Sequence, residues 1–372
     1  MKIKNFISPV LLFGIIFSLS LSPSLATSKK KLEKSAQESQ QRIIIPPQVK
    51  SVIEQGMETR QVRPDIPFTI INNYYLPDFP ARQNLHSIFL FKVKNADLGF
   101  SSLSPVPKDK KKKEEKEVKE QIFLAESEGA PPKLQAICHI FLQFNRLENN
   151  VPKDVAKEIY IPLKLQVDSD SYEPDKEEVF STRNILPPGN YLLSMAIASA
   201  KLEKIGTQYF EFSLPNEAAF TDRLESTPIF LLKKIEQLEA PEMRASIHRG
   251  FFTYIIFQIE PNLEKIVSPG DNLEVFFFVF GAQPDESSKY SLEVAYEILK
   301  GEETAVLYTP QTYATPLIQQ ALPLKQTVII KSEEGEKQED RDLEPGKYTL
   351  ILKITDKVSG YSLEEKFDFE VR

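Results

Sequence analysis

Apolar and polar residues alternate along much of this chain with the two-residue period of β-strands. LQAICHIFL (134–142) and LEVAYEIL (292–299) place apolar residues at every second position. Such a run puts its apolar side chains on one face of a strand. VFFFVF (275–280) is apolar at every position, which predicts a central strand with both faces covered. The pattern therefore predicts an all-β protein.

Two stretches, 185–215 and 343–372, share one design at a constant offset of 157 residues (343 − 186). Each has a Pro-Gly turn, a tyrosine two residues later, a strand, and a second strand that ends in alternating apolar residues. The repeated positions are Pro188, Gly189, Tyr191, Phe210 and Phe212 in the first copy, and Pro345, Gly346, Tyr348, Phe367 and Phe369 in the second. The repetition predicts two tandem antiparallel β-sandwich domains of the immunoglobulin or fibronectin-III type.

The repeated tyrosines have a mechanical interpretation. Pro and Gly form a turn at the end of the sandwich, and the tyrosine that follows buries its ring. We expect its hydroxyl to bond a nearby backbone group, as in a tyrosine corner. In the second copy, Tyr348 and the alternating Phe367 and Phe369 are then expected to complete the core.

The domain boundaries follow from the repeat and from shifts in composition. The predicted segments are a signal peptide (1–26), a disordered leader and short helix (27–61), a first β-sandwich (62–215), a linker (216–247) and a second β-sandwich (248–372). The helix lies within IPPQVKSVIEQGMETRQ (45–61), ends near Gly56 and packs on the first sheet. Two alternatives fit the region between the copies (221–249), an edge strand at PIFLL or a short helix over FLLKKIEQLE.

The first copy carries a Lys/Glu-rich insertion at residues 105–133. This segment has too few apolar residues to fold alone, so we expect a solvated loop between two strands. An electrostatic patch for an anionic surface is the alternative interpretation. The glutamates that follow Lys108–Lys113 neutralise most of the local charge, which favours the loop.

The N-terminus has the pattern of a secretory signal. Lys2 and Lys4 precede an apolar run (6–22), and small residues at Ser24 and Ala26 predict cleavage after Ala26. The alternative is an uncleaved anchor, but the run is short and contains Pro9. We therefore expect an exported protein, periplasmic or extracellular, with no transmembrane span in the mature chain.

Composition adds three constraints. The net charge of −7 gives no basic balance for nucleic acid, so no nucleic-acid partner is expected. With one cysteine, Cys138, the chain has no internal disulfide. The sequence also contains no Asn-x-Ser/Thr glycosylation site, and the two absences together favour a bacterial protein over a eukaryotic secreted one.

Several short motifs resemble sandwich repeats of bacterial secreted proteins that accompany GWxTD or von Willebrand A-type domains. They are STPIFLLKK (226–234), the LPPGNY and LEPGKY turns, IGTQYFEF (205–212) and the ending DKVSGYSLEEKFDFEV. The chain contains no Trp, so the GWxTD signature itself is absent. The resemblance implies a sandwich fold and an exported location, and it implies no mechanism.

The sequence contains no recognised catalytic or cofactor-binding motif, neither a nucleophile elbow nor a Walker loop nor a zinc-protease signature. His86, His139 and His248 are not at metal-ligand spacing. Cys138 alternates with aliphatic residues and is expected to be a small buried hydrophobe. A weak metal candidate is the carboxylate cluster Asp168, Asp170 and Asp175, which has the oxygen ligands that Ca²⁺ prefers but lacks the glycine of an EF-hand loop.

From these features we expect a non-enzymatic structural or interaction protein of the bacterial cell envelope, without a cofactor, whose partner is another envelope or extracellular protein. A carbohydrate- or Ca²⁺-binding module is the alternative, with Tyr74, Tyr75 and Tyr313 as candidate aromatic platforms. The remaining alternative is an enzyme whose site assembles from distant positions.

Overall fold

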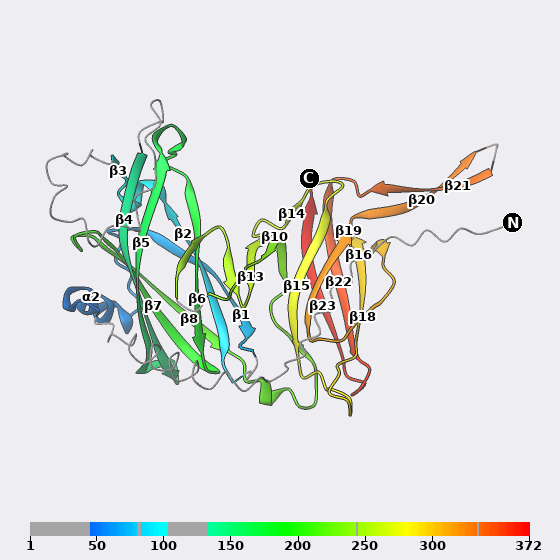
Figure 1. Ribbon diagram of the computed structural model, residues 1–372, viewed down its shortest axis with the longest axis horizontal. Coiled ribbons are helices and arrows are strands. Elements are labelled where there is room, and N and C mark those ends of the chain that lie inside the picture. Colours follow the sequence, from blue (N-terminus) through cyan, green and yellow to red (C-terminus); the bar gives the residue numbers. More distant parts are fainter. Residues whose placement is uncertain (1–44, 80–82, 103–132, 243–244, 333–334) are drawn as a thin grey trace, which may run out of the picture. The chain divides into compact units, whose positions relative to one another are not determined.

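A computed structural model of the chain describes residues 45–79, 83–102, 133–242, 245–332 and 335–372 (Figure 1). The predicted signal peptide and most of the predicted leader lie outside the described residues, and so does the Lys/Glu-rich insertion except Lys133. From Ile45 to Arg372 the chain forms one compact unit. The structure is β-rich, as the alternation predicts.

The regular elements comprise one described α-helix, α2 (Pro47–Met57), and a long series of strands. The strands are, in chain order, β1 (Phe68–Pro77), β2 (Leu85–Lys94), β3 (Ser101–Ser102), β4 (Lys133–Glu148), β5 (Val151–Asp168), β6 (Glu177–Leu186), β7 (Gly189–Ser199), β8 (Ile205–Leu214), β9 (Glu225–Ser226), β10 (Phe230–Gln237), β11 (Ile247–Arg249), β12 (Phe252–Tyr254), β13 (Phe257–Pro261), β14 (Ile266–Val267), β15 (Asn272–Phe280), β16 (Leu292–Lys300), β17 (Glu303–Leu307), β18 (Gln311–Tyr313), β19 (Leu317–Pro323), β20 (Lys325–Ser332), β21 (Gly335–Asp342), β22 (Gly346–Asp356) and β23 (Ser362–Val371).

These strands form four larger sheets and one separate hairpin. The β2 sheet has the order β1-β2-β6-β11, and the β4 sheet has the order β3-β4-β7-β8, with β5 also paired to β4. The β15 sheet has the order β12-β13-β10-β15-β19 with β9 on β15, and the β22 sheet has the order β14-β23-β22-β16-β17 with β18 on β16. Strands β20 and β21 pair only with each other. All pairs are antiparallel except β14 with β23.

The sheets pack face to face in the manner of β-sandwiches. Phe89 of the β2 sheet meets Phe144 and Phe212 of the β4 sheet at ring-centroid distances of 5.8 and 4.9 Å. In the same way, fully buried residues of the β15 and β22 sheets form a second apolar cluster, which includes Phe277 and Tyr296. The predicted sandwich packing is therefore confirmed for the described residues.

Strand β15 is apolar on both faces because both faces are covered. Val275, Phe277 and Val279 belong to the cluster with the β22 sheet, whereas Phe276 and Phe278 belong to the cluster that also contains the β2 sheet. The prediction of a central, doubly covered strand is confirmed.

The covering layer comes from the first half of the chain. The ring of Tyr74 on β1 lies 4.4 Å from that of Phe230 on β10, and Tyr254 on β12 donates a hydrogen bond to the carbonyl oxygen of Pro77 at 2.8 Å. An apolar core thus continues from the β2 sheet into the β15 sheet, and the two sheets bury one another.

Both repeated tyrosines make the predicted hydrogen bond to the backbone four residues earlier. The Tyr191 hydroxyl donates to the carbonyl oxygen of Pro187 at 2.8 Å, and the Tyr348 hydroxyl donates to that of Glu344 at 2.7 Å. The preceding glycines have positive φ angles, 147° at Gly189 and 157° at Gly346, where a side chain would be strained.

The partners of the two tyrosine rings are repeated as well. Tyr191 stacks on Phe212 with a centroid distance of 5.4 Å, and Tyr348 stacks on Phe369 with a distance of 5.8 Å. A cation also lies over each ring, Arg146 at 5.7 Å from Tyr191 and Lys300 at 5.6 Å from Tyr348. The repeat thus extends to positions that its sequence motif does not include.

Helix α2 packs on the outer face of the β4 sheet, as predicted. Its buried Val49 and Ile53 join a cluster with Phe141 of β4 and the alanines of β7. Gly56 allows a close approach, since the Tyr209 hydroxyl donates to the carbonyl oxygen of Ile53 at 2.9 Å and a Cβ on Gly56 would lie 2.3 Å from that hydroxyl. The helix ends at Met57, one residue beyond Gly56, as the sequence predicts.

The structure differs from the sequence prediction in residues 216–247, which contain β9 and β10. Strand β10 is not an edge strand or a helix: it lies between β13 and β15 and pairs with both. The chain then adds β11, at the start of the predicted second sandwich, to β6 of the β2 sheet. The connection from β10 to β12 therefore joins the two halves of the molecule through backbone pairing.

Candidate functional site

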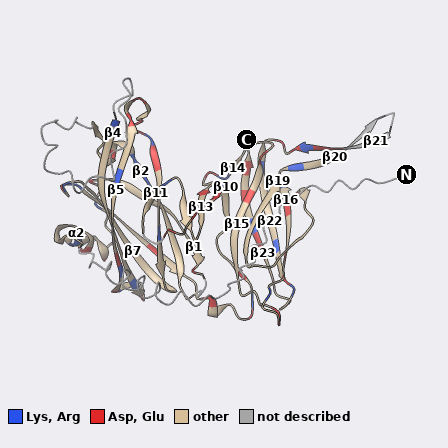
Figure 2. Ribbon diagram, viewed as in Figure 1, with Lys and Arg blue, Asp and Glu red and all other residues tan. Residues whose placement is uncertain are grey.

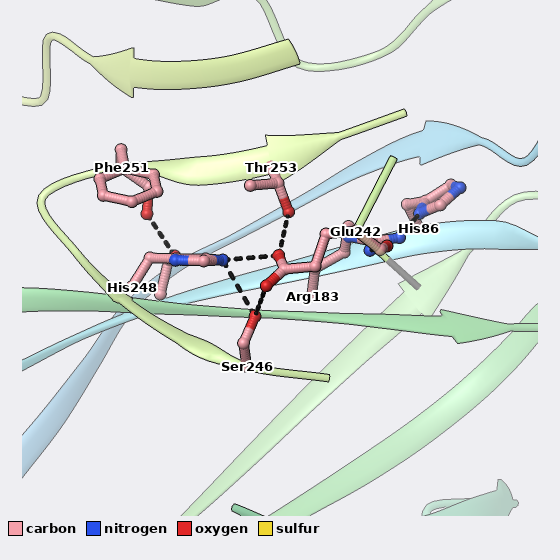
Figure 3. A network of polar contacts seen from close by, with 8 residues as sticks. His86, Arg183, Glu242, Ser246, His248, Phe251 and Thr253 are labelled. Carbon is pink, nitrogen blue, oxygen red and sulfur yellow. Dashed lines mark hydrogen bonds and ion pairs between the residues drawn. The ribbon is translucent and has the colours of Figure 1, made fainter. Parts of the chain in front are cut away.

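A polar cluster lies along the connection from β10 to β12, where it faces the β2 sheet (Figure 3). Its centre is the Glu242 carboxylate. The Ser246 hydroxyl donates to Glu242 Oε1 at 2.7 Å, His248 Nε2 lies 2.7 Å from Oε2, and the Thr253 hydroxyl donates to Oε2 at 2.7 Å. A carboxylate, a histidine and a serine thus meet in one place, which is the residue set of a hydrolase triad.

The geometry is not that of a triad. In a working triad the acid and the serine bind opposite nitrogens of the imidazole, so that the base can take the serine proton. Here Ser246 Oγ (2.9 Å) and Glu242 Oε2 (2.7 Å) both meet the same nitrogen of His248, Nε2. The serine proton is also already donated to the carboxylate. The arrangement can hold the connection in place, but it does not activate a nucleophile.

The electrostatics of Glu242 agree with a structural role. Burial acts to raise the pKa of this carboxyl, but the hydrogen bonds from Thr253, Ser246 and His248 outweigh burial and lower the pKa. A lowered pKa keeps the carboxylate charged, and each of its donors stays bound at neutral pH.

A second part of the network reaches into the β2 sheet. Arg183 on β6 donates from Nη2 to the carbonyl oxygen of Glu242 at 2.5 Å and from Nη1 to Nδ1 of His86 on β2 at 2.7 Å. Since Nδ1 accepts this bond, His86 donates from Nε2 to Asp78 Oδ1 at 3.0 Å. His86 is 4% exposed, and burial followed by the charge of Arg183 lowers its pKa to about 4. His86 is therefore a neutral bridge at pH 7.

The end of β11 is fixed by an ion pair. Arg249 donates to both carboxylate oxygens of Glu178 on β6, at 3.0 and 2.5 Å. The hydrogen bond from Arg249 is the largest cause of the lowered pKa of Glu178. The Gly250 amide donates to the carbonyl oxygen of Val179 at 2.8 Å, and Ser181 donates to that of Phe251 at 2.5 Å. Side chains and backbone together attach this connection to β6.

The structure does not support the weak metal candidate. Asp168, Asp170 and Asp175 are exposed, and Asp170 accepts a hydrogen bond from Ser169 at 3.1 Å. No group of three or more His, Cys, Asp or Glu side chains in the described part of the chain could hold a metal ion. Asp170 lies within a short 3₁₀ turn (Ser169–Ser171), Asp168 precedes this turn and Asp175 follows it, and the turn does not gather their side chains into a ligand set.

The other candidate residues are placed as follows. Cys138 is buried, its Sγ donates to the carbonyl oxygen of Leu98 at 3.4 Å, and burial raises its pKa to about 11, so it is the small hydrophobe that the pattern predicts. His139 contacts the Tyr160 hydroxyl at 2.8 Å. The candidate platforms Tyr74, Tyr75 and Tyr313 are each half-buried, and the rings of Tyr74 and Tyr75 lie against those of Phe230 and Phe280.

Comparison of the sequence with protein-family models and with curated proteins gives no match. The described part of the chain contains no helix with the length and hydropathy needed to span a bilayer.

Proposed function

We propose that this protein is a non-enzymatic interaction protein exported to the bacterial cell envelope, where it binds a protein partner through surfaces of its β-sheets. The observation that carries the proposal is the β20–β21 hairpin. It hydrogen-bonds to no other strand of the described chain and extends from the end of β19 and β22 (Figure 1).

The hairpin is firmly anchored at its base. Leu324 and Leu343, which flank it, are 1% and 2% exposed and belong to the core between the β15 and β22 sheets. The Leu343 amide donates to the carbonyl oxygen of Leu324 at 2.9 Å. Beyond that base the eight pairs from Lys325↔Asp342 to Ser332↔Gly335 are hydrogen-bonded to no other described strand. An isolated two-stranded hairpin is marginally stable in water, so a partner that pairs with its edge would stabilise it.

The sequence of the hairpin also favours a protein partner. KQTVIIKSEEGEKQEDRD (325–342) combines a β-branched apolar run, Val328 to Ile330, with six acidic and four basic residues. Strand addition supplies backbone hydrogen bonds, and the acidic excess favours a partner with a basic surface. Elsewhere acidic and basic residues are interspersed along the strands (Figure 2), a pattern that does not favour a polyanion.

The rest of the proposal rests on the sequence and the polar network. The signal pattern of the first 26 residues supports export, and the single cysteine and the missing glycosylation sites support a bacterial origin. The residues with the most enzyme-like composition, Glu242, Ser246 and His248, bond one another in a way that suits a scaffold.

A shortened hairpin tests the proposal. Lys325 and Asp342 are direct cross-strand partners, so residues 326–341 can be replaced by an Asn-Gly turn between them. We expect this variant to melt like the wild type, since Leu324 and Leu343 remain in the core, and to lose the cross-linked partner recovered from whole cells. A shortened variant that keeps the same partner would exclude the hairpin as the binding surface, and a hydrolytic activity abolished by Ser246→Ala would contradict the non-enzymatic assignment.

A further inference from the structure

The outer edge of β21 presents backbone groups at defined positions. In an antiparallel pair, residues that bond each other alternate with residues whose N–H and C=O groups point away from the partner strand. The Leu343 amide bonds the carbonyl oxygen of Leu324 at 2.9 Å, so Asp342 and Asp340 fall at positions of the second kind. The hydroxyl of Thr327, directly across from Asp340, donates to Asp340 Oδ1 at 2.8 Å, in agreement with this register. The backbone of both aspartates therefore points to an edge at which no described strand pairs.

The same two residues place negative charge along that edge. Asp340 and Asp342 are two positions apart, so their side chains share one face of β21, and both are exposed. Neither carboxylate forms an ion pair with a residue that the structure describes, including Lys325, which lies across the hairpin from Asp342. On the opposite face Glu339 pairs with Arg341 at 3.3 Å. The unpaired carboxylates of this part of β21 are thus on one face.

The sequence keeps this separation along the whole of β21. Positions 336, 338, 340 and 342 are Glu, Gln, Asp and Asp, and both basic residues, Lys337 and Arg341, stand at odd positions. Positions two apart have the same backbone orientation in a strand. Every outward-facing position of β21 is therefore an acid or an amide, and the strand has a net charge of −2 (2 − 4).

This pattern limits which strand can be added. A second copy of β21, paired antiparallel at this edge, would oppose even positions to even positions and so place carboxylates opposite carboxylates. Like charges directly opposite each other destabilise a strand pair, so the edge rejects its own copy. On β20 the outward-facing positions at the base of the hairpin are Lys325 and Thr327, which offer no acid. A basic strand therefore favours β21.

We propose that the edge of β21 binds an extended, antiparallel segment of the partner that has Lys or Arg at every second position. Backbone hydrogen bonds form at Asp340 and Asp342, and the partner residues directly opposite them lie on the same face as the two carboxylates. A basic residue at each of these positions gives a cross-strand ion pair. This inference rests on the proposed function of the hairpin and specifies the chemistry of its partner.

A capped, fluorescently labelled peptide of sequence TKVKVKT, titrated into the full chain and followed by anisotropy, tests this assignment. We expect saturable binding. TQVQVQT keeps the strand pattern without the charge, and TKKKVVT keeps the charge but puts lysines on both faces, so each should bind about fivefold more weakly. The Asp340→Asn/Asp342→Asn variant should show a similar loss, because Asn still accepts the bond from Thr327. Asp168→Asn/Asp170→Asn, two exposed aspartates at the same spacing outside the hairpin, is the matched control and should bind like the wild type.

Three results overturn the assignment: TKVKVKT does not bind, it binds no more tightly than either of the other peptides, or Asp340→Asn/Asp342→Asn binds it like the wild type. Cross-linking in whole cells separates this inference from the proposed function. If the shortened hairpin loses the partner and the double variant keeps it, the hairpin is still the binding surface and only the basic strand is excluded. If the shortened hairpin keeps the partner, the proposed function fails, and the peptide titration still decides whether β21 binds a basic strand.

Discussion

Replacement of Tyr348 gives a stability change whose size follows from its contacts. Tyr348→Phe removes only the 2.7 Å hydrogen bond to the carbonyl oxygen of Glu344. Glu344 is exposed, so water can replace the lost donor, and we expect a loss of about 1 kcal/mol in the free energy of unfolding. Tyr348→Ala also removes a ring that is 3% exposed and stacked on Phe369, which raises the expected loss to roughly 3–5 kcal/mol.

Equilibrium unfolding in urea, followed by far-ultraviolet circular dichroism, measures both losses. Tyr191 makes the equivalent bond, to Pro187, and stacks on the equivalent ring, Phe212, so Tyr191→Phe and Tyr191→Ala should repeat the two values. The β2 and β15 sheets bury one another, and we therefore expect the Tyr191 and Tyr348 variants to lower the midpoint of the same transition. Tyr361→Phe, at a 36% exposed position, is the control and should leave the transition unchanged.

Three results would each refute a part of this reasoning. If Tyr348→Ala unfolds at the wild-type midpoint, the tyrosine corner at Tyr348 does not stabilise the fold. If Tyr348→Phe costs as much as Tyr348→Ala, the stabilisation comes from the hydrogen bond and not from burial of the ring. A two-step transition, with each tyrosine affecting a different step, would show that the shared apolar layer does not couple the two halves.

Three further perturbations test other parts of the structure. The pKa of His86 is lowered to about 4 from an ordinary value of 6.5, so between these values the unfolded chain binds more protons than the folded one. The contribution of neutral His86 to the free energy of unfolding is therefore fully present above pH 6.5 and is lost as the pH falls towards 4. Urea titrations at a series of pH values should show a loss in the free energy of unfolding that approaches roughly 3 kcal/mol, and the His86→Gln variant should show a smaller pH dependence. An equal loss in both proteins would contradict the assignment. The Cys138 thiol, with its pKa raised to about 11 by burial, should react with Ellman's reagent at least about a hundredfold more slowly in the folded protein than in urea, and fast labelling of the native chain would show that the thiol is accessible. Gly56→Ala would place a Cβ 2.3 Å from the Tyr209 hydroxyl and should increase hydrogen exchange in α2. Glu54→Ala, on the exposed side of the helix, is the control and should leave the exchange unchanged. Equal protection of α2 in both variants would refute the close approach.

The sequence predicts local features of this fold well because they depend on neighbouring residues. The two-residue period locates β16, and the Pro-Gly-x-Tyr motif locates both corners, since each tyrosine bonds a carbonyl group only four positions away. The apolar run in β15 predicts that both faces are covered. It does not reveal that β1 of the first half supplies one of the covers, because that contact joins positions about 200 residues apart.

The parts that the sequence does not predict are those with short or irregular patterns. Strand β10 buries only Phe230, Leu231 and Leu232, and its polar second half hides the strand period. Strand β11 has three residues, too few to show a period. The polar network escapes prediction for another reason: His86 and Arg183 become neighbours only through the register of β2 and β6.

The most direct test of the proposed function is site-specific cross-linking in living cells. A photoreactive amino acid at Thr327, an exposed position of β20, should give one discrete adduct with an envelope protein after irradiation. The same group at Val358, which is 42% exposed and lies between β22 and β23, should give no such adduct. If position 327 yields no adduct, or if both positions yield the same diffuse set of products, the hairpin is not the surface through which this protein binds a partner.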